Sequence, residues 1–115
     1  MKLSHQIENE IGIIQVKGDI TWQNAGEFRF YVQSLADDHP LQAIVVNLEQ
    51  VTKIDSSGMG ILYSLHKTSE KQNIRWMLCQ VNNDAYEVMR DVGLDRAITL
   101  YKTVEEALAL LKENP

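Results

Sequence analysis

The chain has 115 residues, of which 44% are hydrophobic and 23% charged, proportions that are usual for one globular domain. With 11 basic and 16 acidic residues the net charge is −5, which argues against a protein that binds the nucleic-acid backbone. Since no window approaches the roughly 18 to 20 apolar residues of a membrane span and the N-terminus lacks an apolar signal core, we expect a soluble, cytoplasmic protein without membrane or nucleic-acid partners.

The chain opens with a predicted β-hairpin. Apolar and polar residues alternate over residues 3–7 and again over 14–17, a period that indicates two half-buried strands. Residues 8–12 between them have the composition of a turn. A hairpin is the simplest connection, so we expect an antiparallel pair at one edge of a sheet.

A helix and a buried strand follow the hairpin. From Trp22 the apolar residues recur at helical spacing, and residues 37–40 end the helix. Its apolar face is formed by Ala25, Phe28, Val32 and Leu35. The run 43–48 is short, apolar and rich in β-branched residues, which is typical of a strand covered on both faces. We expect it to be the central strand.

Helices and strands alternate through the rest of the chain. The predicted elements are a helix that starts around Gly58 and ends near Lys71, a strand over 74–81, a helix capped by residues 82–84 with Gly93 at its C-cap, a strand over 97–101, and a helix opened by a capping box at 103–106. The order β-β-α-β-α-β-α-β-α predicts one α/β domain over residues 1–115. We expect a mixed, mostly parallel five-stranded sheet and four helices.

Patterns of catalytic or metal-binding residues are missing from the sequence. His5, His39 and His66 do not have the spacing of a metal site, and no glycine-rich phosphate loop occurs. Cys79, the single cysteine, lies in an apolar run, where a small buried hydrophobe is its expected role. We therefore expect no enzyme activity, no catalytic residue, no metal and no cofactor.

Residues 51–60 stand apart because they combine two adjacent serines and two glycines between a strand and a helix. An aspartate and a serine at this point can cap the helix. Capping leaves Met59, Gly60 and Tyr63 unexplained, which follow Ser56 by three, four and seven residues and so share one helical stripe. We predict that Met59 and Tyr63 are exposed beside the glycine and form a partner-binding surface with a hydroxyl at its edge.

The sequence of residues 54–60, Ile-Asp-Ser-Ser-Gly-Met-Gly, resembles the signature of the STAS domain, in particular that of the bacterial anti-sigma-factor antagonists. The resemblance covers nearly the whole chain, from the opening hairpin through residues 16–20 and the strand at 44–48 to the signature helix. In that family the first serine after the aspartate is phosphorylated by a partner kinase that is also the anti-sigma factor. The resemblance therefore implies that Ser56 is a phosphorylation site.

Two departures from the family pattern concern the partner surface. The family usually has leucine where this chain has Met59, a change that conserves volume. Many members follow the glycine–acidic–apolar element with another acidic residue, whereas here Gly18, Asp19 and Ile20 are followed by Thr21. We interpret Thr21 as a cap for the first helix.

The resemblance implies a binding module that is not itself an enzyme. The unmodified protein would bind an anti-sigma-factor serine kinase and release a sigma factor, phosphate on Ser56 would end this binding, and a PP2C-type phosphatase would act on the phosphorylated form. The expected partner-binding residues are Asp19, Thr21, Asp55, Ser57, Gly58, Met59, Gly60 and Tyr63.

Two alternatives stay open. One is a scaffold or adaptor STAS subunit in a stressosome-like or transporter-associated complex. The other is a serine hydrolase that uses Ser56 or Ser57, for which the sequence supplies no identifiable histidine partner.

Overall fold

The computed structural model describes residues 1–114 of the chain, which form five strands and five helices. In chain order these are β1 (Lys2–Glu8), β2 (Ile11–Lys17), α1 (Ala25–Asp38), β3 (Ala43–Gln50), α2 (Ser56–Lys71), β4 (Arg75–Cys79), α3 (Asn83–Asp91), α4 (Leu94–Ala97), β5 (Leu100–Tyr101) and α5 (Val104–Glu113). The predicted order of elements is confirmed, with the one-turn helix α4 as an addition. The strand predicted over 97–101 is shorter, since α4 includes Ala97 and β5 comprises only Leu100 and Tyr101.

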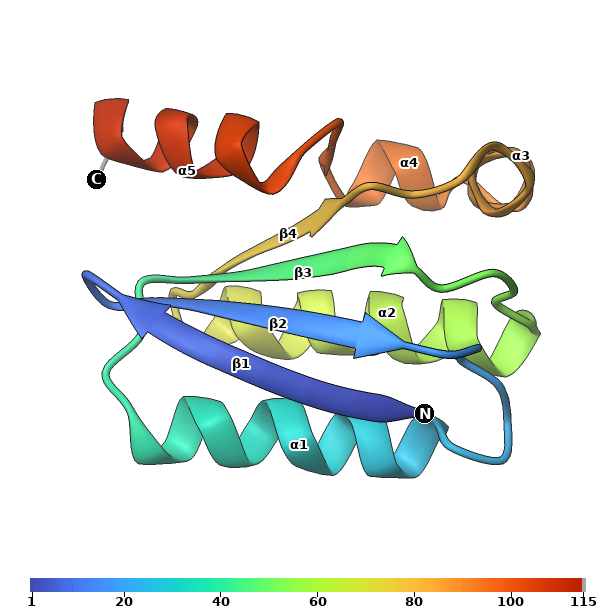
Figure 1. Cartoon of the computed structure of the whole chain (residues 1–115), viewed down its shortest axis with the longest axis horizontal. Helices are drawn as coiled ribbons and strands as arrows, with labels where there is room; N and C mark the ends of the chain where they lie inside the picture. Colours follow the sequence, from blue (N-terminus) through green and yellow to red (C-terminus); the bar gives the residue numbers. More distant parts are fainter. Residues whose placement is uncertain (115) are drawn as a thin grey trace.

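The five strands form one sheet in the order β1-β2-β3-β4-β5 (Figure 1). β1 and β2 pair antiparallel, and every other neighbouring pair is parallel. β3 therefore lies at the centre, as its run of β-branched residues predicts. The mixed, mostly parallel sheet with an opening hairpin is confirmed.

Helices cover both faces of the sheet. α1 and α2 lie on one face and α5 on the other (Figure 1). The main core forms between the sheet, α1 and α2 and includes Ile14, Phe28, Val46, Leu62 and Leu78. A smaller core beneath α5 includes Ile13, Val45, Met77, Ala107 and Leu111. Of the helices in residues 1–114, none is long and apolar enough to cross a membrane.

The two hairpin strands differ in burial, so the prediction that both are half-buried holds for residues 14–17 and is wrong for β1. Ile14 and Val16 of β2 are buried in the main core, and one residue earlier Ile13 is buried on the other face, in the core under α5. β1 is the edge strand and is almost wholly exposed, with Leu3 as its partly buried contact to the core. Alternation in the sequence gives the two faces of a strand, but it does not tell which faces other elements cover.

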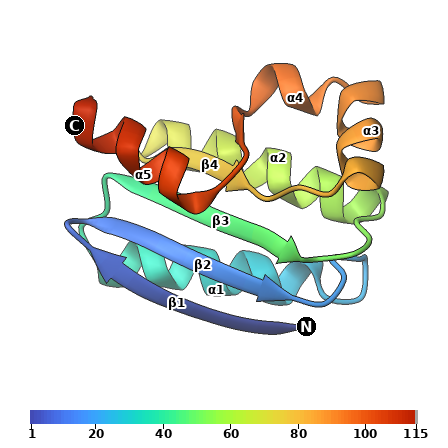
Figure 2. The same ribbon diagram turned by 45° about the horizontal axis from the view of Figure 1, so that its top comes forward.

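Helices α3 and α4 lie near the carboxyl end of β3 and beside the start of α2 (Figure 2). Both helices contribute to the main core through Ala85, Met89 and Leu94. Gly93 separates them with a positive φ of 80°, a conformation that glycine adopts at little cost. This arrangement brings α3 and α4 to the segment that contains Ser56.

Candidate functional site

Hydrogen bonds extend the sheet beyond the ends of β2 and β3, up to the segment that contains the signature. The N–H of Gly18 donates to the carbonyl of Gln50 at 3.0 Å, and the N–H of Ile20 donates to the carbonyl of Lys53 at 3.0 Å. The N–H of Asp55 in turn donates to the carbonyl of Ile20 at 3.2 Å. The two loops are therefore held together by backbone bonds, and α2 starts from a fixed position.

Asp55 connects the start of α2 to the loop before α1. As the N-cap of α2, it accepts a hydrogen bond from the N–H of Gly58 through Oδ1 at 2.8 Å, and its Oδ2 accepts from the N–H of Trp22 at 3.0 Å. Asp19 acts in the same way, since its Oδ1 accepts from the N–H of Lys53 at 3.0 Å. Both carboxylates satisfy backbone N–H groups and so order the junction.

The two glycines of the signature have different surroundings. Gly58 is buried, and a Cβ atom on it would stand 2.4 Å from the carbonyl oxygen of Ile20. Gly60 is exposed, and a Cβ atom there would meet nothing within 4 Å. Gly58 is therefore required by packing at the junction, whereas the surface of α2 above Gly60 is open.

Thr21 does not cap α1, so that interpretation is wrong. The N-cap of α1 is Asn24, whose side chain forms bonds within the preceding turn: its Oδ1 accepts from the N–H of Thr21 at 2.9 Å and its Nδ2 donates to the carbonyl of Asp19 at 2.8 Å. The Thr21 hydroxyl accepts from the N–H of Gln23 at 3.3 Å. A hydroxyl shortly before a helix can either cap the helix or accept a hydrogen bond within the preceding turn. The residue at which the helix begins decides which of these two roles it has.

Ser56 lies at the edge of an apolar groove between α2 and the pair α3–α4. The groove has a volume of about 430 Å³ and is lined by Ser56, Met59, Gly60, Tyr63, Val88, Val92, Gly93, Leu94 and Ala97. We call it the α2–α3 groove. Ser56 and Ser57 are both exposed, but Ser57 is absent from the lining because successive side chains on a helix diverge by about 100°.

Met59 is 5% exposed and belongs to the main core, so the prediction that it is an exposed contact residue is wrong. It lines the α2–α3 groove from below, because α3 and α4 pack against this side of α2. Tyr63, one turn further along, is 44% exposed, as predicted. Sequence reasoning also missed Val88 and Val92, which have the helical spacing of core residues and yet are exposed beside the groove.

A second hollow of about 390 Å³ adjoins the α2–α3 groove and shares Val88 with it. Its lining is Asp19, Thr21, Thr52, Lys53, Ile54, Asp55, Asp84, Ala85 and Val88. We call it the acidic hollow, because three carboxylates and one amine line it. Within residues 1–114, no group of three or more His, Cys, Asp or Glu side chains is placed to hold a metal ion.

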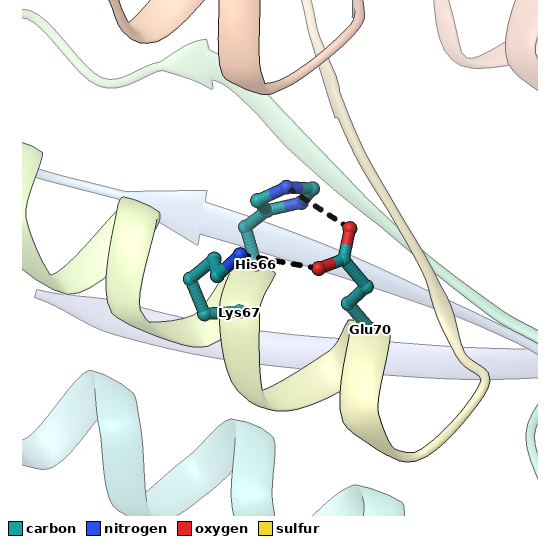
Figure 3. A network of polar contacts seen from close by, with 3 residues as sticks. All are labelled: His66, Lys67 and Glu70. Carbon is teal, nitrogen blue, oxygen red and sulfur yellow. Dashed lines mark hydrogen bonds and ion pairs between the residues drawn. The ribbon is translucent and has the colours of Figure 1, made fainter.

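The histidine on α2 is remote from Ser56. His66 lies ten residues further along the helix, which corresponds to about 15 Å. Its Nε2 is 3.9 Å from Oε2 of Glu70, and Nζ of Lys67 is 3.2 Å from Oε1 of the same carboxylate (Figure 3). This network occupies the C-terminal half of α2, so His66 cannot serve as a base for a hydroxyl at the start of the helix.

The same fold recurs in known proteins. A curated relative, the Anti-sigma F factor antagonist of Paenibacillus polymyxa, is 22% identical over 114 residues, which cover 97% of each chain. The structure of an anti-sigma factor antagonist from Mycobacterium paratuberculosis gives a TM-score of 0.85 at 20% identity and covers 96% of this chain and 93% of that one. The anti-sigma factor antagonist SpoIIAA in its unphosphorylated form gives a TM-score of 0.82 at 19% identity over 99% of both chains. The STAS domain family matches residues 2–107, and the chain therefore belongs to that family.

Proposed function

We propose that this chain is an anti-sigma factor antagonist. Its unphosphorylated form binds an anti-sigma-factor serine kinase and so releases a sigma factor, and phosphorylation of Ser56 ends the binding. The observation that carries the proposal is the position of Ser56, an exposed serine in the first turn of α2 at the edge of an apolar groove. The related antagonists support it, since one of them has been solved specifically in its unphosphorylated form.

The partner would cover the α2–α3 groove and the start of α2. Tyr63, Val88 and Val92 expose apolar surface there, and burial of such surface favours association. The neighbouring acidic hollow, with Asp19, Asp55 and Asp84, complements a partner surface that carries basic side chains.

Phosphate on Ser56 acts on this interface instead of on the fold. The N-terminus of a helix accommodates a phosphate, because N–H groups of its first turn lack intrahelical acceptors. The added charge, about −1.5 to −2 at pH 7, would stand beside the apolar groove and next to the Asp55 carboxylate. A covering partner would have to desolvate that charge, which weakens binding. A PP2C-type phosphatase would restore the binding form.

A phosphorylation assay with matched serine variants tests the proposal. The purified chain is incubated with ATP and each recombinant anti-sigma-factor kinase encoded in the genome that carries it, and the product is examined by intact mass and peptide mapping. We expect one phosphate on the wild type and on Ser57→Ala, none on Ser56→Ala, and weaker kinase binding after modification. Phosphate on Ser57, or binding that is indifferent to phosphate, would contradict the proposal. A large homo-oligomeric particle in light scattering would favour the scaffold alternative.

A further inference from the structure

We propose that Trp22 is a specificity-determining contact for the partner that covers Ser56, on the side of the site next to α1. The inference rests on the proposed function. Trp22 is 71% exposed, and it lines neither the α2–α3 groove nor the acidic hollow. It therefore extends the partner surface in a direction that the two hollows do not cover.

The indole projects from a rigid turn. The N–H of Trp22 is bound by the Asp55 carboxylate, and the carbonyl of the preceding Thr21 accepts hydrogen bonds from the N–H groups of Asn24 and Ala25 at 3.1 and 2.9 Å. A partner that covers Trp22 consequently orders one side chain with two torsions and no backbone. Such preorganised aromatic residues are frequent among the side chains that dominate binding energy.

One carboxylate fixes the backbone that carries the indole relative to the first turn of α2. Asp55 binds the N–H of Trp22 with Oδ2 and the N–H of Gly58, in the first turn of α2, with Oδ1. Because Ser56 lies in the same turn, the backbones of Trp22 and Ser56 keep a constant spacing. A partner that covers Ser56 and the α2–α3 groove can therefore also reach the exposed indole without any change in the backbone.

Two other aromatic residues provide controls. Phe30 is 74% exposed, about as much as Trp22, but it lies on α1, eight residues after Trp22 in the chain. Within the described residues, no hydrogen bond connects its segment to the start of α2. Trp76, the other of the two tryptophans, is buried at 5% exposure. Exposure alone thus does not single out Trp22; its connection to Asp55 does.

Affinity measurements compare Trp22→Ala with Phe30→Ala. Each variant and the wild type are titrated with the recombinant kinase that binds the wild type, at about 0.1 M and about 0.5 M NaCl. We expect Trp22→Ala to raise the Kd at least about tenfold, while Phe30→Ala stays within about twofold of the wild type. The ratio for Trp22→Ala should be similar at both salt concentrations, because salt screens charges and not apolar contacts. Melting temperatures of both variants should match the wild type.

Fluorescence gives a second readout. The kinase should shift Trp22 emission to shorter wavelength and protect it from acrylamide, and Trp22→Phe should abolish the change. If the wild type binds but Trp22→Ala binds within about twofold of it and the indole stays quenchable, Trp22 is not a contact and the proposed function stands. If the wild type binds none of the kinases, the proposed function and this inference fail together.

Discussion

Gly58 lies directly against the backbone of Ile20 at the point where α2 begins. A Cβ atom on Gly58 would stand 2.4 Å from the carbonyl oxygen of Ile20 and 2.7 Å from Cγ2 of Ile54. The same carbonyl accepts a hydrogen bond from the N–H of Asp55, so it cannot move away without breaking that bond. The close approach of α2 to the end of the sheet therefore depends on the missing side chain.

We expect Gly58→Ala to lower the free energy of unfolding by roughly 1 to 3 kcal/mol, because the added methyl group meets backbone and a packed isoleucine. Gly60→Ala is the matched control. Its Cβ enters open space, and alanine favours a helix over glycine by about 0.5 to 1 kcal/mol, so this variant should be more stable than the wild type. Urea titrations of both variants test this, and a gain in stability for Gly58→Ala would show that the junction is loose.

Met59 and Tyr63 should respond differently to a lysine. Met59→Lys places a charge in the main core, and we expect a loss of several kcal/mol in stability or failure to fold. Tyr63→Lys replaces a side chain that is 44% exposed, so the melting temperature should change little while partner binding falls. A normally stable Met59→Lys protein would mean that the side of α2 facing α3 is open to solvent.

The same two residues show how far the sequence predicts the site. Spacing places Met59 and Tyr63 on one side of α2, and the signature correctly locates Ser56 at a helix start beside them. What spacing does not contain is the position of α3 and α4, which pack against that side and bury Met59. Val88 on α3 and Val92 at its C-cap have the spacing of core residues, yet both are exposed, because Ala85 and Met89 make the contacts of α3 with the core.

The fold was more predictable than the surface. Period, caps and β-branched runs depend on the local backbone, so they predict the order of elements and the central strand correctly. Burial depends on neighbours that are distant in the chain, which explains the errors at β1 and at Met59.

Stability and phosphorylation should both depend on the two carboxylate oxygens of Asp55. Asp55→Ala removes the cap of α2 and the bond to Trp22, so we expect a loss of about 0.5 to 2 kcal/mol in stability and slower phosphorylation of Ser56. Asp55→Asn keeps one acceptor oxygen, so its stability and its phosphorylation rate should lie between those of Asp55→Ala and the wild type. Thermal melts and initial phosphorylation rates provide the measurement. Equal behaviour of all three proteins would reduce Asp55 to a polar loop residue.

Ser56→Ala should leave both the fold and kinase binding intact. The cap of α2 is Asp55, so the Ser56 hydroxyl is not needed for capping and the change in stability should stay within about 0.5 kcal/mol. Binding to the kinase should become insensitive to ATP, whereas Ser56→Glu should bind weakly at all times. Calorimetric titration with and without ATP distinguishes the two. Loss of binding in a folded Ser56→Ala protein would make the hydroxyl a direct contact instead of a switch.

The thiol of Cys79 should be unreactive in the folded protein. Burial raises the pKa of its thiol to about 12, with smaller contributions from the negative charges of Glu106 and Glu105. The neutral thiol is a poor nucleophile, so Ellman's reagent at about pH 8 should react after unfolding in urea and not before. Because the folded protein holds this proton more tightly than the unfolded chain, whose thiol titrates near 9.0, stability should fall as pH rises from about 9 towards about 12. Cys79→Ala should show a shallower fall over the same range, although its stability at neutral pH is lower because the smaller side chain leaves a cavity. An identical pH dependence in the two proteins would show that other groups cause the alkaline loss of stability.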